Sequence, residues 1–280
     1  MKKNLNTRPI PKVMAALIAC LFIISLASCG GGARQADTDK TADGKTLDEA
    51  FKAVTSYPIP TSFEVVKMLN KAGASYIISL NNPVENVDKY FTEKSKALNL
   101  GVYGANLSYA STYQMKQETM NYLNVSKKLI DDLQISTAFN MQFAQRVEQN
   151  IDNKDSLIHI ISNSFYDTYQ FLTNQGKDNL SLLIMAGSWV EGVYITCQIA
   201  IISKDNSDFL KILADQYEPL NTLLNLMEPA SSDVAISEVA DMLKPLSEVY
   251  KEFKGETITN DQFETINNLI TKIRNQIINS

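Results

Sequence analysis

The most apolar stretch of the chain, residues 180–202, constrains the fold more than any other feature. Its sequence is LSLLIMAGSWVEGVYITCQIAII, in which Glu191 and Gln198 stand among apolar or small residues. A helix that is apolar on most of its circumference is buried, either in a protein core or in a membrane. A carboxylate near the centre of a membrane-spanning helix costs roughly 2.5–3.5 kcal/mol. Glu191 therefore favours a central core helix, with a membrane span as the alternative.

Apolar residues at helical spacing continue through most of the chain from Leu47 onward. Thr61 and Glu64 have the spacing of a capping box, and Asn82-Pro83 marks another helix start. Only residues 74–80, ASYIISL, are a serious strand candidate. We predict an all-α fold of roughly nine to eleven helices, a single bundle or an irregular helical array. The later helices are expected at residues 101–119, 120–134, 137–150, 154–175, 179–203, 207–227, 233–253 and 260–278.

Two prolines, Pro219 and Pro245, lie inside segments whose apolar periodicity continues on both sides. A proline in a helix interior removes one backbone hydrogen bond and clashes with the preceding turn. We therefore expect two kinked helices, at residues 207–227 and 233–253. Four shorter helices are the alternative.

The N-terminus has the outline of a secretory signal peptide, because residues 1–12 carry four basic residues and no acidic one, and an apolar core follows them. Leu26-Ala27-Ser28-Cys29 then resembles the lipobox of bacterial lipoproteins. This resemblance implies cleavage of residues 1–28 and attachment of lipid to Cys29, with the protein anchored in the cell envelope. Residues 17–20 also fit the motif, but cutting there would leave too short an apolar core. The resemblance is confined to this N-terminus, and the helical body resembles no family known to us.

The region after Cys29 is a tether, since residues 29–45 hold small and polar residues and no large apolar side chain. Residues 46–280 are then the globular domain. Gly30 follows the cysteine where some inner-membrane lipoproteins have aspartate, so the resemblance favours the outer membrane over the inner. Removal of the signal leaves 22 basic against 31 acidic residues, which argues against a nucleic-acid partner. The predicted partners are the membrane, through the lipid, and another envelope protein.

The residue types that carry catalysis are scarce in this sequence. His159 is the only histidine, and Cys197 would be the only free thiol of a lipidated mature chain. These two residues cannot build a histidine or cysteine metal cluster, and no glycine-rich phosphate loop or EF-hand spacing accompanies them. We expect a structural His159, no metal, no cofactor and no enzymatic activity.

Two stretches are candidate ligand sites. Glu191 and Gln198 belong to a polar stripe, with Ser181 and Ser188, along the apolar helix. If that stripe faces a cavity, it can bind a cationic or hydroxylated ligand; if it faces solvent, it is the polar side of a nearly buried helix. The other stretch carries tyrosines among small residues, which either present a binding surface or fill the core: Tyr103, Tyr109 and Tyr113.

The leading functional hypothesis is an envelope lipoprotein whose helical domain binds another envelope component or holds an assembly at the membrane. A small-molecule-binding lipoprotein, with an inter-helix pocket near Glu191, is the alternative. A hydrolase that uses carboxylates alone comes third.

Overall fold

The computed structural model describes residues 62–136, 142–253 and 258–280. These residues form ten α-helices and three short 3₁₀ helices, and no strand occurs among them. The predicted all-α fold is therefore confirmed. The α-helices are α2 (Ser62–Lys71), α3 (Glu93–Thr112), α4 (Lys116–Asp132), α5 (Gln142–Gln149), α6 (Lys154–Asn174), α7 (Asp178–Ile202), α8 (Ser207–Ala214), α9 (Tyr217–Met227), α10 (Val234–Lys251) and α11 (Asn260–Ile278). The 3₁₀ helices are η1 (Ile78–Leu80), η2 (Val84–Lys89) and η3 (Glu228–Ala230).

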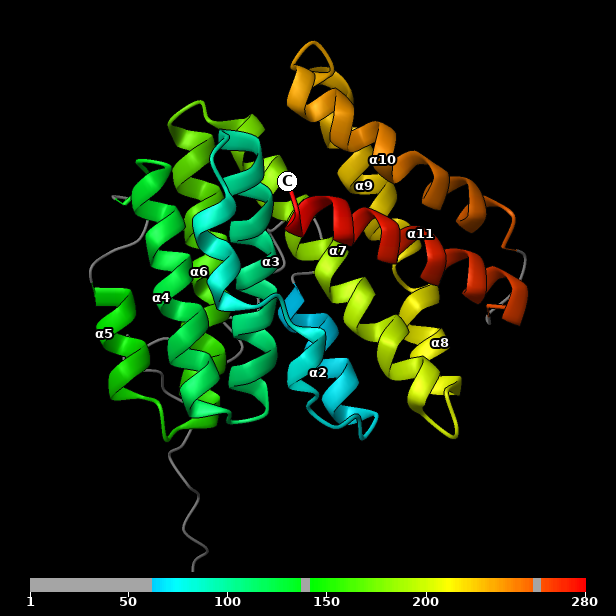
Figure 1. The fold of residues 1–280 in the computed structure, drawn as a ribbon, viewed down its shortest axis with the longest axis horizontal. Coiled ribbons are helices and arrows are strands. Elements are labelled where there is room, and N and C mark those ends of the chain that lie inside the picture. Colours follow the sequence, from blue (N-terminus) through cyan, green and yellow to red (C-terminus); the bar gives the residue numbers. More distant parts are fainter. Residues whose placement is uncertain (1–61, 137–141, 254–257) are drawn as a thin grey trace, which may run out of the picture. The chain divides into compact units, whose positions relative to one another are not determined.

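Helix α7 joins two groups of helices (Figure 1). On one side it packs against α3 and α6, with α4 and α5 further out. On the other side it contacts α8, α9, α10 and α11, and α2 packs against α3, α7 and α8. The array is irregular rather than a parallel bundle, because α9, α10 and α11 run obliquely to α3, α4 and α6 in this view.

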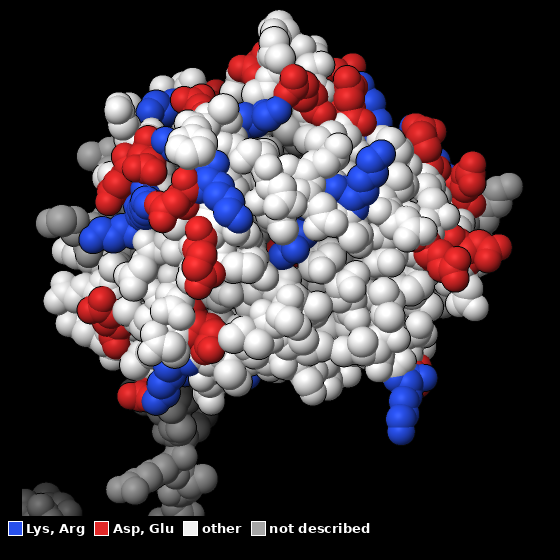
Figure 2. Space-filling model, in the orientation of Figure 1, with Lys and Arg blue, Asp and Glu red and all other residues white. Residues whose placement is uncertain are grey.

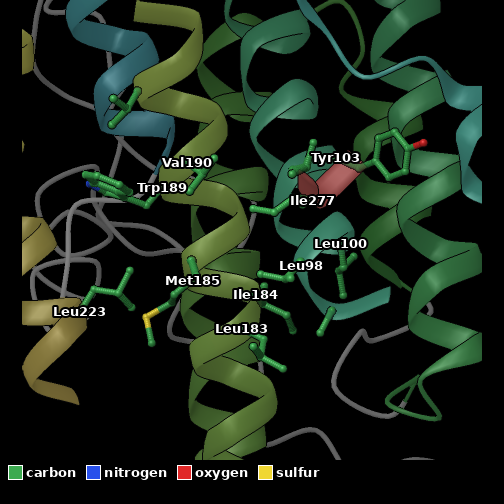
Figure 3. Packing of buried hydrophobic residues seen from close by; sticks show 14 of the residues in the cluster. Leu98, Leu100, Tyr103, Leu183, Ile184, Met185, Trp189, Val190, Leu223 and Ile277 are labelled. Carbon is green, nitrogen blue, oxygen red and sulfur yellow. The ribbon is translucent and has the colours of Figure 1, made fainter. Parts of the chain in front are cut away.

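The core is formed chiefly between α3 and α7. Residues 97–112 of α3 are buried without interruption, and α7 is buried almost throughout. Figure 3 shows Leu98 and Ile184 lying between these two helices, while Trp189 and Met185 extend from α7 toward α9. Each such side chain contributes about 1.5–3 kcal/mol when fully buried. The 25-residue α7 is long and apolar enough to cross a membrane, yet the domain itself covers it.

Glycines let α3 and α7 touch through their backbones. A Cβ placed on Gly101 would lie 2.0 Å from the Ile184 carbonyl oxygen, and one on Gly187 would lie 1.9 Å from the Leu98 carbonyl oxygen. No side chain larger than hydrogen fits at such distances. Gly187 thus permits close packing of the two helices, whereas the nearest atoms to a Cβ on Gly192 would stand at 3.8 Å.

Local sequence explains several helix ends. Thr92 and Thr259 close capping boxes at the starts of α3 and α11, and Asp233 caps α10. Helix α3 ends before Gln114, which adopts a left-handed conformation (φ 59°). The capping box predicted at Thr61 lies outside the described residues.

Several boundaries differ from the sequence prediction. The helix expected at residues 101–119 begins at Glu93, because Thr92 caps it, and ends at Thr112. The strand candidate contains η1 instead, and the helix expected after Asn82-Pro83 is only the 3₁₀ helix η2. Residues 137–141, the start of another expected helix, lie outside the described part.

The two prolines behave differently. Pro245 lies inside the continuous helix α10, within the single helix predicted at residues 233–253. Pro219 lies instead in the first turn of α9, where its missing N–H removes no hydrogen bond. Residues 207–227 are therefore two helices, α8 and α9, which is the alternative that the sequence left open.

Candidate functional site

Glu191, the carboxylate singled out in the sequence, is fully buried and paired with Arg274 of α11. Arg274 Nε donates to Oε2 at 3.0 Å, and its Nη2 donates to Oε1 at 3.3 Å. Asn106 Nδ2 of α3 also donates to Oε1, at 2.8 Å. Burial acts to lower the pKa of Arg274, but the charge and hydrogen bonds of Glu191 more than offset it and raise this pKa. The carboxylate therefore connects α7 with α3 and α11.

This ion pair belongs to a larger buried network. Arg274 Nη2 also donates to the Leu80 carbonyl at 2.9 Å, and Asn106 Oδ1 accepts from the Asn82 backbone N–H at 3.0 Å. Asn82 Nδ2 in turn donates to Tyr90 Oη at 2.9 Å. The segment that carries η1 and η2 is thereby fixed to the core by hydrogen bonds with α11 and with α3.

The same network reaches the C-terminal end of α11. Asn99 Nδ2 donates to the Ile277 carbonyl at 2.9 Å, and Tyr90 Oη donates to the Ile278 carbonyl at 3.2 Å. Such carbonyls have no partner within a helix. Side chains distant in sequence donate to them here, alongside Ser280 at the Ile277 carbonyl, so that the end of α11 is held against α3.

The candidate tyrosines form part of the core. Tyr103 and Tyr109 are fully buried, and desolvation raises the pKa of each. Tyr103 Oη donates to the Pro83 carbonyl, while Tyr109 Oη donates to the Ser75 carbonyl. Tyr113 is half-buried and packs edge-on against the Tyr109 ring at 5.1 Å. Their hydroxyls hold the segment that precedes α3, and the buried rings of Tyr103 and Tyr109 present no surface to a ligand.

The residues of the polar stripe expected along α7 do not share one environment. Ser181 lines a cavity beside α3 and α6, whereas Glu191 faces Arg274. Gln198 is half-buried, and its Nε2 donates to Asn267 Oδ1 of α11 at 2.9 Å. Glu191 and Gln198 therefore contact α11, whereas the sequence predicted either a cavity or solvent on this side of α7.

The residues that sequence reasoning missed are Arg274 and the buried asparagines. Arg274 lies among Ile270, Ile273 and Ile277 on the apolar side of α11. A cation on the buried, apolar face of a helix requires a buried partner. The position of Arg274 among isoleucines in the sequence could therefore have predicted a buried ion pair. The asparagines offered no comparable signal, since they occur in loops and helices throughout the chain.

Two further residues were weighed for chemistry. His159 is buried in α6, and Cys197 is buried in α7, where desolvation raises the pKa of its thiol. A thiol with a raised pKa is a poor nucleophile. Within the described residues, no three His, Cys, Asp or Glu side chains lie together as metal ligands. Cys29, the predicted lipidation site, lies outside them.

Beyond the first two residues of α7, its accessible side chains lie in the second half of the helix, where four uncharged residues recur at helical spacing: Tyr194, Gln198, Ile201 and Ile202. We name these residues the α7 stripe. Ile201 and Ile202 are 52% and 63% exposed, unusually high for large aliphatic residues. The Arg274 guanidinium stacks on the Tyr194 ring at 4.4 Å. Figure 2 shows few charged side chains over α2 and the lower half of α7.

Comparison with known proteins gives no relative from which a role can be transferred. No family model matches the chain, and neither a curated protein nor a solved structure is significantly similar to it. The functional argument therefore depends on the residues themselves.

Proposed function

We propose that this protein is an envelope lipoprotein, anchored through lipid on Cys29, whose helical domain binds another protein of the cell envelope. The lipobox-like residues 26–29 support the anchor, and Gly30 after the cysteine supports the predicted preference for the outer membrane. The α7 stripe supports the binding role, and it is the observation on which the proposal depends.

The stripe has the composition of a protein-binding surface. Tyrosine and isoleucine bury apolar area on association, and the core of an interface is depleted of charge. The absence of a charge at any of the four stripe positions contrasts with the strongly acidic remainder of the mature chain. The occupant that fits is therefore an apolar protein face rather than a nucleic acid or an anionic surface.

The small-molecule alternative near Glu191 has weaker support. Both oxygens of this carboxylate accept hydrogen bonds from Arg274 or Asn106, so its acceptor capacity is largely used inside the protein. A ligand that took over these bonds would first have to displace Arg274. We therefore retain partner binding as the proposed function.

The test is crosslinking of the full-length protein in its native envelope, followed by purification and identification of captured proteins. Ile202→Lys places a charge in the α7 stripe at a helix C-terminus, where a cation is tolerated. Val234→Lys is the control, because Val234 is a 72% exposed aliphatic residue at the start of α10, on a different helix from the stripe. We expect one partner to be captured by wild type and Val234→Lys and lost with Ile202→Lys. Equal capture by both variants would exclude the stripe as the binding surface.

A further inference from the structure

Helices α9 and α10 lie side by side (Figure 1), and a groove runs between them. The two helices are antiparallel, because the chain reverses at η3 and Ser247 near the end of α10 bonds to Asn221 near the start of α9. The groove holds about 440 Å³, within the range of roughly 300–1,000 Å³ that is typical of ligand sites. Neither Glu191 nor any residue of the α7 stripe lines it.

Small side chains of α10 open the groove. Ser237, Ala240 and Ser247 line it at helical spacing along one face of this helix. The fourteen steps from Ser237 to Lys251, the two ends of its α10 lining, correspond to about 21 Å of helix. An extended peptide rises about 3.3 Å per residue, so the groove is long enough for about six residues of such a chain.

The groove carries no net charge. Two acidic and two basic residues line it: Glu228, Glu248, Lys244 and Lys251. Lys251 pairs with Glu248, and Lys244 pairs with Asp241 one turn earlier in α10. None of the described residues that line the groove is aromatic, so it offers no ring face on which a sugar could stack. These features favour an uncharged chain over an anion or a sugar.

Two asparagine amides in the groove are available to a ligand. The Asn225 side chain forms no hydrogen bond with any described residue. Asn221 Oδ1 accepts from Ser247 Oγ at 3.2 Å, which orients this amide, while its Nδ2 donates to no described residue. A carbonyl oxygen has two lone pairs, so Asn221 Oδ1 can accept a second bond. Each amide therefore offers a donor and an acceptor, as the backbone of another chain does.

The spacing of the two amides matches an extended backbone. Asn221 and Asn225 are one turn apart on the same face of α9, about 6 Å along the helix axis. In an extended chain the N–H and C=O of one residue point to the same side, and that side recurs at every second residue, about 6.6 Å further on. Two side-chain amides of α9 can therefore bond to alternate residues of one peptide.

We propose that the α9–α10 groove binds an extended, uncharged segment of about six residues from a partner protein. Asn221 and Asn225 each bond to the N–H and C=O of one residue, and these two residues are separated by one other. Main-chain hydrogen bonds of this kind provide affinity, while the surrounding side chains select the sequence. Leu224 and Ala240 supply apolar contacts for the bound side chains. The site is separate from the α7 stripe and does not rest on the function proposed for it.

The test is selection of binders from a phage-displayed library of random short peptides, with the purified full-length protein as the target. Selected peptides are synthesised, and fluorescence anisotropy gives their dissociation constants. Each backbone nitrogen is then methylated in turn, which removes one N–H donor at a time. We expect methylation at two alternate residues to raise the dissociation constant about fivefold each, as for the loss of one hydrogen bond. Methylation of the residue between them should leave it unchanged.

Matched variants locate the binding. Asn225→Leu removes an exposed amide at similar volume, and we expect it to raise the dissociation constant about fivefold. It should also abolish the effect of methylation at one of the two sensitive residues, and Asn221→Leu should do so at the other. Asn268→Leu is the control, because Asn268 is an exposed asparagine of α11 that does not line the groove. Circular dichroism checks folding; if Asn221→Leu does not fold, the exposed Asn225 decides the test.

Three results would overturn the proposal: no peptide is selected, the Asn225 and Asn268 variants bind equally well, or the methylation losses do not alternate. An oligomer of N-acetylglucosamine is the probe for the competing class of ligand. Binding of this sugar that Asn225→Leu abolishes, with no peptide selected, would assign the groove to a glycan instead. The Ile202→Lys variant should retain peptide binding even if it loses its protein partner, so the two proposals fail independently.

Discussion

Arg274 reaches Glu191 across 83 residues of sequence, and the two charges are buried together. Removing two ions from water is expensive, and their attraction offsets this only when hydrogen bonds satisfy both groups. Asn106 and the Leu80 carbonyl provide those additional bonds. At the scale of single residues, the pair therefore specifies how α11 sits on α7 more than it adds stability.

Arg274→Ala is expected to lower the free energy of unfolding by about 3–5 kcal/mol, because it leaves the Glu191 carboxylate buried without a counter-charge. The double variant Glu191→Leu, Arg274→Met removes both charges and should recover most of this loss. Urea denaturation followed by circular dichroism measures both changes. A single variant that lost less than about 1 kcal/mol would show that the pair is accessible to water in solution.

At the scale of elements, the crossing of α3 and α7 positions the rest of the domain. Gly101→Ala would place a Cβ 2.0 Å from the Ile184 carbonyl oxygen and 2.6 Å from the Ser188 nitrogen, so the two helices must separate. We expect a loss of about 3 kcal/mol or more, at the upper end for overpacking in a core. Thermal unfolding of the variant checks this expectation.

Gly192→Ala in α7 is the control, because a Cβ there would face Ser62 and Val65 of α2 rather than α3. Its Cβ would have ordinary contacts at 3.8 Å, and alanine is favoured over glycine in a helix interior by up to ~1 kcal/mol. The melting temperature should be unchanged or raised. Similar losses for the two variants would mean that backbone contact does not determine this crossing.

At the scale of the whole molecule, the burial of Cys197 makes its thiol a reporter of global unfolding. The side chain is fully buried in α7, and desolvation raises the pKa of the thiol well above its ordinary range. Alkylation in native buffer should therefore be slow, and its rate should rise with denaturant in parallel with the fraction unfolded. Peptide mapping identifies the labelled residue.

An exposed position provides the comparison for this reporter. Ile202→Cys on the α7 stripe should react within the time expected of a free thiol, under the same native conditions. Rapid native labelling of Cys197 would indicate that α7 opens locally and is less firmly held than its burial implies.

The sequence by itself determined the all-α class and predicted the boundaries of several helices to within one residue. The helix expected at residues 260–278 coincides with α11, and the one expected at residues 179–203 differs from α7 by one residue at each end. Apolar periodicity, caps and proline are local signals that depend only on neighbours in the chain. Where those signals were ambiguous, the prediction failed in part. The boundaries of the helix expected at residues 101–119 were wrong, and residues 207–227 form the two shorter helices that were the alternative.

Only the tertiary structure decided what Glu191 contacts and where a groove lies. The sequence could identify a carboxylate in an apolar helix, but its partner Arg274 lies on another helix, and no local pattern connects them. The groove likewise depends on how α9 and α10 pack, and neither Asn221 nor Asn225 carries a mark of it in the sequence. Periodicity fixes which face of a helix is buried, whereas contacts between distant helices follow from three-dimensional packing, which periodicity does not encode.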